Sequence, residues 1–248
     1  MNDNYINLEA DIKDPATQVS VEPMVFYVDD DDAMCKSIRF LIESVSLQIK
    51  TFSSAKDFLD KYVPGTPGCL LLDVRMPEMS GLELQEQLSK RNIEIPIIFI
   101  TGHGDVPMAT RAMKAGAVEF LTKPFNDQAL LDSIQSAIEI DEEQQKANIE
   151  KRHIAERVEK LTRREFEVMK CVVNGNLNKV TAYELGISPK TVELHRAKIM
   201  EKMQAKSLAH LVKMVLTYYD IIGHKYTPRK NKLNSLPQNN TFNFQVEL

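Results

Sequence analysis

The chain has 248 residues, and at roughly 150 residues per domain this length favours two modest domains over one large core. Hydrophobic residues make up 43% and charged residues 27%, ordinary values for a globular protein, which excludes a collagen-like or wholly disordered chain. The net charge of −4 conceals an asymmetry, because residues 1–150 carry 13 Lys and Arg against 26 Asp and Glu, whereas residues 151–248 carry 18 against 9. This split suggests an acidic module joined to one that binds an anionic partner; chance together with a solvated acidic helix is the alternative.

The first half of the chain alternates between short apolar runs and segments with apolar residues at helical spacing. Residues 1–22, which precede this pattern, are polar and aperiodic and are interpreted as a flexible leader with no assigned function. Ser80 and Glu83 form a capping box for one helix, and Asn126 is the expected cap of the last. Continuous apolar runs are typical of strands buried on both faces, so residues 23–140 are predicted to form a doubly wound α/β domain with a parallel sheet. The predicted strands are Met24–Val28, Leu47–Phe52, Cys69–Leu72, Ile95–Ile100 and Val118–Leu121.

A long helical pattern begins at Asp127 and continues through a charged stretch without Gly or Pro. It predicts a single, partly solvated helix, of which residues 141–160 act as a stiff linker. Ala147, Ile154 and Leu161 recur every seven residues, which leaves a short coiled coil open.

Residues 161–224 show an all-helical pattern. Thr162 and Glu165 supply a second capping box, and Ser188, followed by proline, caps a later basic helix that follows a tight glycine turn. Two helices joined in this way predict a helix-turn-helix. Residues 225–248, with prolines and several asparagines, are predicted to be a disordered tail.

Polar side chains follow the predicted strands at the edge where a doubly wound sheet binds its ligands. They are Asp29 and Asp30 after the first strand, Asp73 after the third, Thr101 after the fourth and Lys123 just past the fifth. Clustered carboxylates need a cation, and oxygen ligands with room for water suit Mg²⁺. Asp73 is then placed to act as a nucleophile toward a phosphoryl group, with Lys123 and Thr101 neutralising its oxygens. Taken singly, each residue also fits a helix start or a strand-end turn, so the prediction depends on their joint placement.

Four segments, in order, resemble the receiver domain of bacterial two-component response regulators. The resemblance covers about residues 23–140 and implies the flavodoxin-like fold of that family. The segments are Val28-Asp29-Asp30, Leu71-Leu72-Asp73-Val74-Arg75-Met76-Pro77, Ile100-Thr101-Gly102-His103-Gly104-Asp105 and Phe120-Leu121-Thr122-Lys123-Pro124-Phe125.

The resemblance also implies roles for individual residues. Asp73 is the expected phosphoacceptor of a partner histidine kinase, Thr101 and Phe120 are the expected switch pair, and a cis peptide is expected before Pro124. The implied Mg²⁺ ligands are the carboxylates of Asp29, Asp30 and Asp73 and the backbone carbonyl of Arg75.

The basic half is similar to the LuxR-type (NarL/LuxR) helix-turn-helix over residues 161–222, and both halves together resemble the FixJ-like subgroup of response regulators. One departure is Val180-Thr181, where the family more often has Ile-Ala, so Thr181 brings a hydroxyl to the packing surface and the turn is expected to be looser. The matching segments are Leu161-Thr162-Arg163-Arg164-Glu165, residues 172–179, and Leu185-Gly186-Ile187-Ser188-Pro189-Lys190-Thr191-Val192-Glu193-Leu194-His195-Arg196.

The third helix of this half is the expected DNA-reading helix. Val192, Ile199 and Met203 share its buried stripe, which leaves the remaining side chains free for DNA. Basic residues there would contact phosphates, Glu193 would accept from a cytosine amino group, and small apolar side chains would meet thymine methyls. His195 stands at no metal-ligand spacing and is interpreted as packing or a phosphate contact. The predicted DNA-binding residues are Lys179, Lys190, Thr191, Glu193, Leu194, Arg196, Ala197 and Lys198.

Together these patterns predict a phosphorylation-controlled transcription factor that is not an enzyme, with Mg²⁺ as cofactor. The expected partners are a sensor histidine kinase, promoter double-stranded DNA, a second copy of the chain after phosphorylation and, by resemblance, RNA polymerase. No apolar run approaches the roughly 18 residues that span a bilayer, and a bacterial cytoplasmic location is expected. Cys35, Cys69 and Cys171 are interpreted as small core residues. Two alternatives stay open: an enzyme with an aspartyl-phosphate intermediate, and a docking module whose helical half binds protein or RNA.

Overall fold

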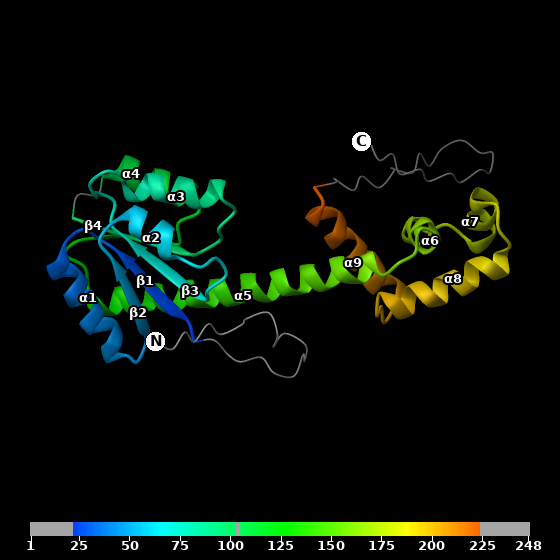
Figure 1. Ribbon diagram of the computed structural model, residues 1–248, viewed down its shortest axis with the longest axis horizontal. Coiled ribbons are helices and arrows are strands. Elements are labelled where there is room, and N and C mark those ends of the chain that lie inside the picture. The colour runs from blue at the N-terminus through cyan, green and yellow to red at the C-terminus, as the bar shows by residue number, and fades with distance from the viewer. Residues whose placement is uncertain (1–21, 103–104, 224–248) are drawn as a thin grey trace, which may run out of the picture. The chain divides into compact units, whose positions relative to one another are not determined.

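The computed structural model describes residues 22–102 and 105–223, and the chain divides into two compact units between Gln145 and Lys146 (Figure 1). The predicted tail and all but the last residue of the predicted leader lie outside the described residues. Within those residues, no helix combines the length and the apolar character needed to cross a membrane.

The first unit contains a five-stranded parallel sheet in the order β2-β1-β3-β4-β5. β3 and β4 are buried along their whole length, whereas the edge strand β2 alternates between exposed and half-buried positions and ends on the buried Phe52. All five predicted strands are confirmed, with ends shifted by at most two residues. The strands are β1 (Met24–Val28), β2 (Gln48–Phe52), β3 (Gly68–Leu72), β4 (Ile97–Thr101) and β5 (Glu119–Thr122).

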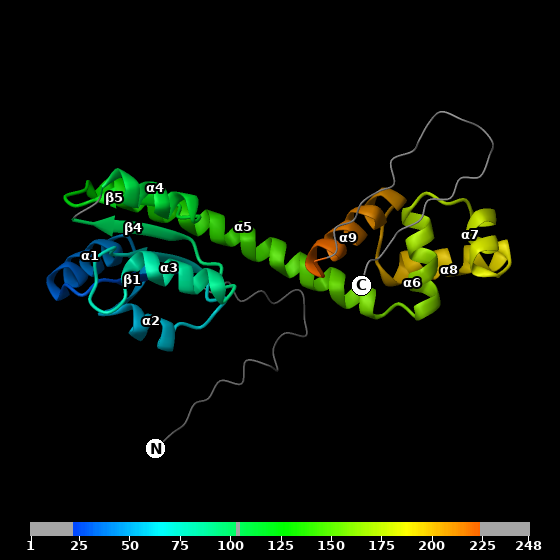
Figure 2. The ribbon, with the colours of Figure 1, turned by 90° about the horizontal axis from the view of Figure 1, so that it is seen from above.

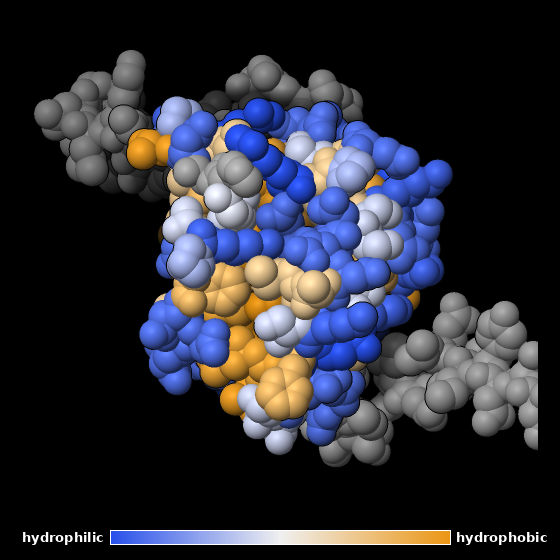
Figure 3. All heavy atoms as spheres, turned by 90° about the vertical axis from the view of Figure 1, so that its left-hand side faces the viewer, coloured by the Kyte–Doolittle hydropathy of each residue, from blue (hydrophilic) through white to orange (hydrophobic). Residues whose placement is uncertain are grey.

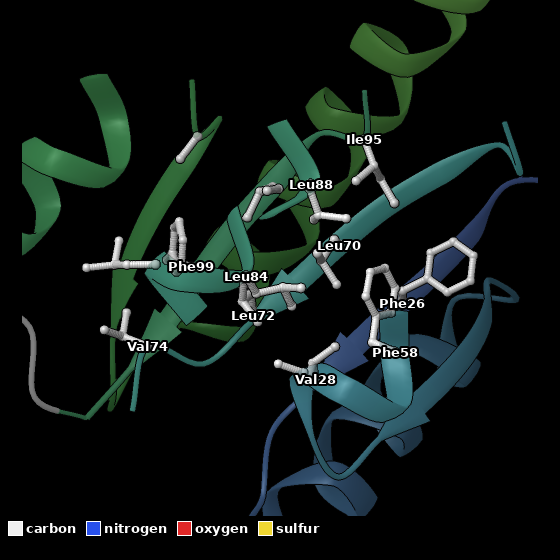
Figure 4. Packing of buried hydrophobic residues seen from close by; sticks show 14 of the residues in the cluster. Phe26, Val28, Phe58, Leu70, Leu72, Val74, Leu84, Leu88, Ile95 and Phe99 are labelled. Atoms are coloured by element: carbon white, nitrogen blue, oxygen red, sulfur yellow. The ribbon is translucent and has the colours of Figure 1, made fainter. Parts of the chain in front are cut away.

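Helices cover both faces of this sheet, as predicted for a doubly wound domain. α2, α3 and α4 bury one cluster of side chains, and α1 and the first half of α5 bury the other. Figure 4 shows the first cluster, in which Leu84 and Leu88 of α3 lie against Leu72 and Leu70 of β3. The helices are α1 (Asp32–Ser44), α2 (Ala55–Lys61), α3 (Gly81–Lys90), α4 (Val106–Lys114) and α5 (Asp127–Glu159).

The surface of the first unit is largely hydrophilic on the face seen in Figure 3, with apolar side chains gathered in one area.

The predicted helix caps of this unit are confirmed. The Ser80 hydroxyl accepts the N–H of Glu83, whose carboxylate accepts the N–H of Ser80, and Asn126 accepts from the first turn of α5.

The second unit contains four helices, and the end of α5 contributes to their core. Figure 2 shows these helices beside the end of α5. Its core buries Val168 of α6, Val192 and Ile199 of α8, and Leu211 of α9. Thr162 and Glu165 form the predicted capping box, and the turn before α8 contains a left-handed glycine. The helices are α6 (Arg163–Val173), α7 (Asn178–Leu185), α8 (Pro189–Lys202) and α9 (Leu208–Ile221).

The ends of the predicted linker belong to the two units. Asp141 is buried and its carboxylate accepts the N–H of Gly68 in the first unit, while Ile154 and Val158 lie in the core of the second. Leu161 packs against that second core as well, so two of the three positions spaced by seven, Ile154 and Leu161, have packing partners within this chain. We therefore propose residues 142–153 as the linker.

Candidate functional site

An acidic cluster lies at the carboxyl ends of β1 and β3. One carboxylate oxygen from each of Asp29, Asp30 and Asp73 lies within 4.8 Å of the other two. Asp29 is 2% and Asp73 6% exposed, whereas Asp30 is open to solvent. Two buried acids thus meet a third at an accessible edge of the sheet.

The Asp29 carboxylate is held by three donors. The backbone N–H of Asp31 donates to Oδ1 over 2.9 Å, and the Tyr27 hydroxyl donates to Oδ2 over 2.5 Å. Lys123 Nζ donates to the same Oδ2 over 2.8 Å. These contacts fix the orientation of the carboxylate and satisfy much of its charge within the protein.

The Asp73 carboxylate accepts the N–H of Arg75 on Oδ2 over 2.9 Å, and its Oδ1 lies 3.5 Å from Lys123 Nζ. α3 begins against the backbone of Asp73, because a Cβ on Gly81 would lie 2.2 Å from the Asp73 carbonyl oxygen. This close approach requires glycine at position 81, and the glycine allows the helix to close over the end of β3.

Charge and burial oppose each other at this cluster. Burial raises the pKa of the Asp73 carboxyl and Asp29 adds to the shift, while Lys123 and the Arg75 N–H offset part of it. Burial also works against the charge on Lys123, but the hydrogen bond and charge of Asp29, together with Asp73, outweigh burial and raise the pKa of this ammonium. The lysine therefore stays protonated between the two acids.

The donor set of the cluster fits Mg²⁺. It consists of carboxylate oxygens on a partly open edge, which suits an ion that prefers oxygen ligands and keeps several waters. Three carboxylates against the single ammonium of Lys123 leave negative charge that a divalent cation can balance. The cluster is thus an acidic pocket compatible with Mg²⁺.

The other two predicted receiver residues lie on β4 and β5. Thr101 is 1% exposed at the end of β4, and its carbonyl accepts the N–H of Lys123 over 2.8 Å. The Phe120 ring is half-buried and tilted against Phe99, with the ring centroids 6.0 Å apart. The peptide between Lys123 and Pro124 is cis, as the family resemblance implied.

Tyr27 was missed by the sequence reasoning. It is fully buried, and burial, followed by the hydrogen bond and charge of Asp29, raises the pKa of its hydroxyl and keeps the proton in place. A signal was present, because Tyr27 precedes Asp29 by two residues and side chains at i and i+2 of a strand leave the same face.

The second unit presents the predicted DNA-reading helix α8. Val192, Ile199 and Met203 are buried, as predicted. Thr191 and Arg196 are only half-buried, and the Thr191 hydroxyl lies 2.8 Å from that of Ser188, within the helix cap. The exposed members of the predicted set are Lys179 on α7 and Lys190, Glu193, Leu194, Ala197 and Lys198 on α8.

Two further polar groups qualify this surface, Glu193 and His195. Asn178 Nδ2, at the start of α7, lies 3.5 Å from Glu193 Oε1, so the carboxylate is turned toward the neighbouring helix. His195 is half-buried, its buried Nδ1 has no hydrogen-bond partner in the described structure, and it joins none of the metal-ligand groups found among those residues.

Comparison with known proteins assigns both units. Residues 25–135 match the response regulator receiver domain, and residues 159–215 match the luxR family of bacterial regulatory proteins. Nodulation protein W of Bradyrhizobium diazoefficiens is 47% identical over 198 residues, which cover 80% of this chain and 87% of that protein. The transcriptional regulatory protein FixJ of Azorhizobium caulinodans is 46% identical over 192 residues, covering 77% and 91%. The structure of the response regulator StyR is 47% identical, has a TM-score of 0.71, and covers 79% of this chain and 100% of that one. The chain therefore belongs to the response regulators that join a receiver domain to a LuxR-type DNA-binding domain, in the group that includes FixJ.

Proposed function

We propose that Asp73 accepts a phosphoryl group from a partner histidine kinase and that the modified protein pairs on promoter DNA to regulate transcription. The observation that carries this proposal is the acidic cluster, in which Lys123 bridges the carboxylates of Asp29 and Asp73. The receiver comprises residues 23–140 together with Asp141, and the DNA-binding domain comprises residues 161–224 together with the end of α5 that packs in its core.

The chemistry at Asp73 is a transfer between two carriers. A carboxylate oxygen of Asp73 attacks the phosphorus of a phosphohistidine, a new O–P bond forms, and the P–N bond breaks as the imidazole leaves with its electron pair. Lys123 stabilises charge on the phosphoryl oxygens, and the Thr101 hydroxyl donates to one of them. Mg²⁺, when bound, neutralises the same oxygens; Asp29, Asp30, Asp73 and the carbonyl of Arg75 would hold it.

Modification of Asp73 then changes the surface of the receiver. A hydrogen bond from Thr101 to the phosphoryl group draws that side chain toward the site and gives the ring of Phe120 room to follow. The altered surface joins two receivers, so that two DNA-binding domains bind together. Tethering makes the second DNA contact intramolecular, which raises affinity by about 10² to 10⁴ without a new base contact.

On DNA, exposed lysines position the protein and α8 reads the bases. Lys179, Lys190 and Lys198 contact phosphates, while Glu193, Leu194 and Ala197 meet base edges in the major groove. The half-buried Thr191 and Arg196 lie at the rim of this face and contact the backbone. Bound at a promoter in the bacterial cytoplasm, the dimer acts on RNA polymerase.

The test of this function is phosphate uptake and its consequence for DNA binding. Wild-type protein with Mg²⁺ and a small phosphodonor is expected to gain an acid-stable, alkali-labile label and to bind a two-fold site more tightly. Asp73→Asn is expected to do neither, and Asp30→Ala is expected to weaken Mg²⁺ binding with the fold intact. A label on Asp73→Asn would contradict the assignment of the phosphoacceptor.

The same assays separate the rival functions. Asp73 is followed by Val74-Arg75, so no second acid stands two residues on to protonate a leaving group. Repeated turnover of a phosphate ester would nevertheless favour an enzyme. Failure to shift any duplex promoter fragment would favour a docking module. An equal oligomeric state before and after modification, with DNA affinity still rising, would favour relief of inhibition over dimerisation.

A further inference from the structure

Hydrogen bonds among the described residues leave one acceptor position of the Asp29 carboxylate open to a cation. Two carboxylate oxygens offer about four lone-pair positions. The Asp31 N–H takes one on Oδ1, and the Tyr27 hydroxyl and Lys123 Nζ take two on Oδ2. The remaining position is on Oδ1, the oxygen that neither Tyr27 nor Lys123 contacts.

Tyr27 is built rigidly into the sheet. It lies in β1 between β2 and β3, is 0% exposed, and packs in the cluster formed with α1 and α5. A buried ring between paired strands has no other rotamer to adopt without disturbing the core. Its hydroxyl is therefore a fixed donor, unlike Lys123, whose flexible side chain also reaches toward Asp73.

We propose that Tyr27 is a positioning residue for the Mg²⁺ site. Its hydroxyl holds Asp29 Oδ2 and, by fixing the plane of the carboxylate, directs Oδ1 to the cation. This inference rests on the proposed function, since it assumes that Asp29 is a Mg²⁺ ligand. Residues that orient a metal-ligating group typically change metal affinity by about 10- to 100-fold when they are removed.

Two effects of the hydroxyl oppose each other. The hydrogen bond withdraws negative charge from the carboxylate, and this effect alone would make a variant without it bind Mg²⁺ more tightly. Loss of orientation acts the other way, because the freed carboxylate must be ordered again on binding. Orientation dominates here, since Lys123 still contacts Oδ2 and limits the charge that is regained.

The experiment is Mg²⁺ titration of the unphosphorylated full chain by isothermal calorimetry. Tyr27→Phe is expected to weaken binding by about 10-fold or more. Tyr62→Phe is the matched control, because Tyr62 is a buried tyrosine of the same unit that packs with Phe26 and Phe58 in the other cluster. The Mg²⁺ affinity of this control variant is expected to stay at the wild-type value. An unchanged or tighter affinity in Tyr27→Phe would overturn the inference.

A second readout separates positioning from general damage to the site. At saturating Mg²⁺, Tyr27→Phe is expected to take up phosphate from a small phosphodonor at the wild-type rate, with only the Mg²⁺ concentration for half-maximal rate raised. A rate that stays low at saturation would overturn the positioning role. Should Tyr27→Phe melt well below wild type, both assays are run at a temperature at which circular dichroism shows the variant to be fully folded. If wild-type protein itself fails to bind Mg²⁺, the proposed function is contradicted. If wild type and Tyr27→Phe bind Mg²⁺ with equal affinity, only the positioning role of Tyr27 is contradicted.

Discussion

The carboxylate of Asp141 on α5 accepts the backbone N–H of Gly68, the first residue of β3, over 2.9 Å. Gln145 donates a second hydrogen bond to it over 2.8 Å. Gly68 has a φ of 140°, and a Cβ there would lie 1.8 Å from the Met24 carbonyl oxygen, so no other residue can start this strand in the same way. A buried acid of the long helix is thus fastened to the central sheet.

Asp141→Asn is expected to stabilise the protein at neutral pH. Burial raises the pKa of the Asp141 carboxyl above its ordinary 3.8, with Glu142 adding to the shift and the bonds from Gly68 and Gln145 offsetting part of it. A raised folded-state pKa means that stability falls as the pH rises from about 4 through the raised value. Asparagine keeps an acceptor for Gly68 without the charge, so Asp141→Asn should raise the melting temperature at pH 7 and flatten the profile.

Asp141→Ala serves as the control for the hydrogen bond. It leaves the buried N–H of Gly68 without an acceptor and is expected to lose about 1 to 3 kcal/mol of stability at pH 4, and less at pH 8, where wild type carries the cost of the buried charge. Thermal melts of both variants between pH 4 and pH 8 make the comparison. An asparagine variant less stable than wild type at pH 7 would show that the ionised form is the one the fold requires.

Glu165→Gln is expected to destabilise the DNA-binding domain. Glu165 is buried; Lys202 of α8 donates to it over 2.6 Å and the Thr162 N–H over 2.8 Å. Burial works against the charge, but these hydrogen bonds and the charge of Lys202 outweigh burial and lower the pKa of Glu165 to about 2. Because glutamine gives Lys202 an uncharged partner, the free energy of unfolding should fall by about 1 to 3 kcal/mol at pH 7.

The pH dependence of this pair has a definite sign. Because the folded-state pKa is depressed, the stabilisation is fully present above 4.5 and is lost as the pH falls from there toward 2. Denaturant unfolding at pH 7 and pH 3 should therefore show a smaller difference between wild type and Glu165→Gln at the acid pH. Glu167→Gln, at a half-buried position of the same helix that pairs with the surface residues Arg163 and Arg164, is the control and should change less.

Much of the first unit could be predicted because its signals are local. Apolar runs located all five strands, and the residues that follow them include Asp29, Asp73 and Lys123, which the parallel topology brings together. α2 was not located, since seven residues give too short a period to separate a helix from a loop. α4 was not located either, because it carries only one fully buried residue, Ala112, and so gives little apolar periodicity.

Three features were missed, one because its contact is distant in sequence and two because hydropathy and helical angle do not report side-chain hydrogen bonds between near neighbours. Asp141 and its partner Gly68 are 73 residues apart, and a lone acid in a charged stretch gives no sign of burial. In the sequence, Tyr27 looks like one more apolar residue of a buried strand, because a hydropathy pattern does not show that its hydroxyl donates a hydrogen bond to Asp29. Thr191 was predicted to face DNA from its helical angle, which does not reveal its hydroxyl's contact with Ser188.

Thr181→Val is expected to stabilise the DNA-binding domain. Thr181 is 0% exposed in α7, and its hydroxyl oxygen is buried without a hydrogen-bond partner in the described part of the chain. Valine has nearly the same shape and removes the unsatisfied group, a gain of about 1 to 3 kcal/mol. Thr217→Val is the control, because the Thr217 hydroxyl donates to the Lys213 carbonyl and its loss should not stabilise. Equal melting temperatures for wild type and Thr181→Val would indicate that the hydroxyl finds a water in solution.

Glu193→Ala and Lys190→Ala are expected to weaken DNA binding in different ways. Base contacts specify and phosphate contacts position, so Glu193→Ala should relax the preferred sequence by about 1 to 3 kcal/mol at one base pair. Lys190→Ala should instead weaken binding to all sequences alike and reduce the slope of log affinity against log salt by about 1. Binding-site selection measures the first effect, and anisotropy titrations over a range of salt measure the second.

Lys206→Ala is the matched control for these two variants. Lys206 is exposed beyond the far end of α8, so Lys206→Ala should leave the selected site unaltered and should change the salt slope less than Lys190→Ala does.

Asn178 affects how the result for Glu193→Ala is interpreted. The Asn178 amide lies 3.5 Å from the Glu193 carboxylate and holds it toward α7 when DNA is absent. If Glu193→Ala leaves the selected sequence unaltered while Lys190→Ala lowers the salt slope, Glu193 stays turned toward α7 on DNA. Base readout then falls to Leu194 and Ala197, the exposed apolar positions of the same helix face.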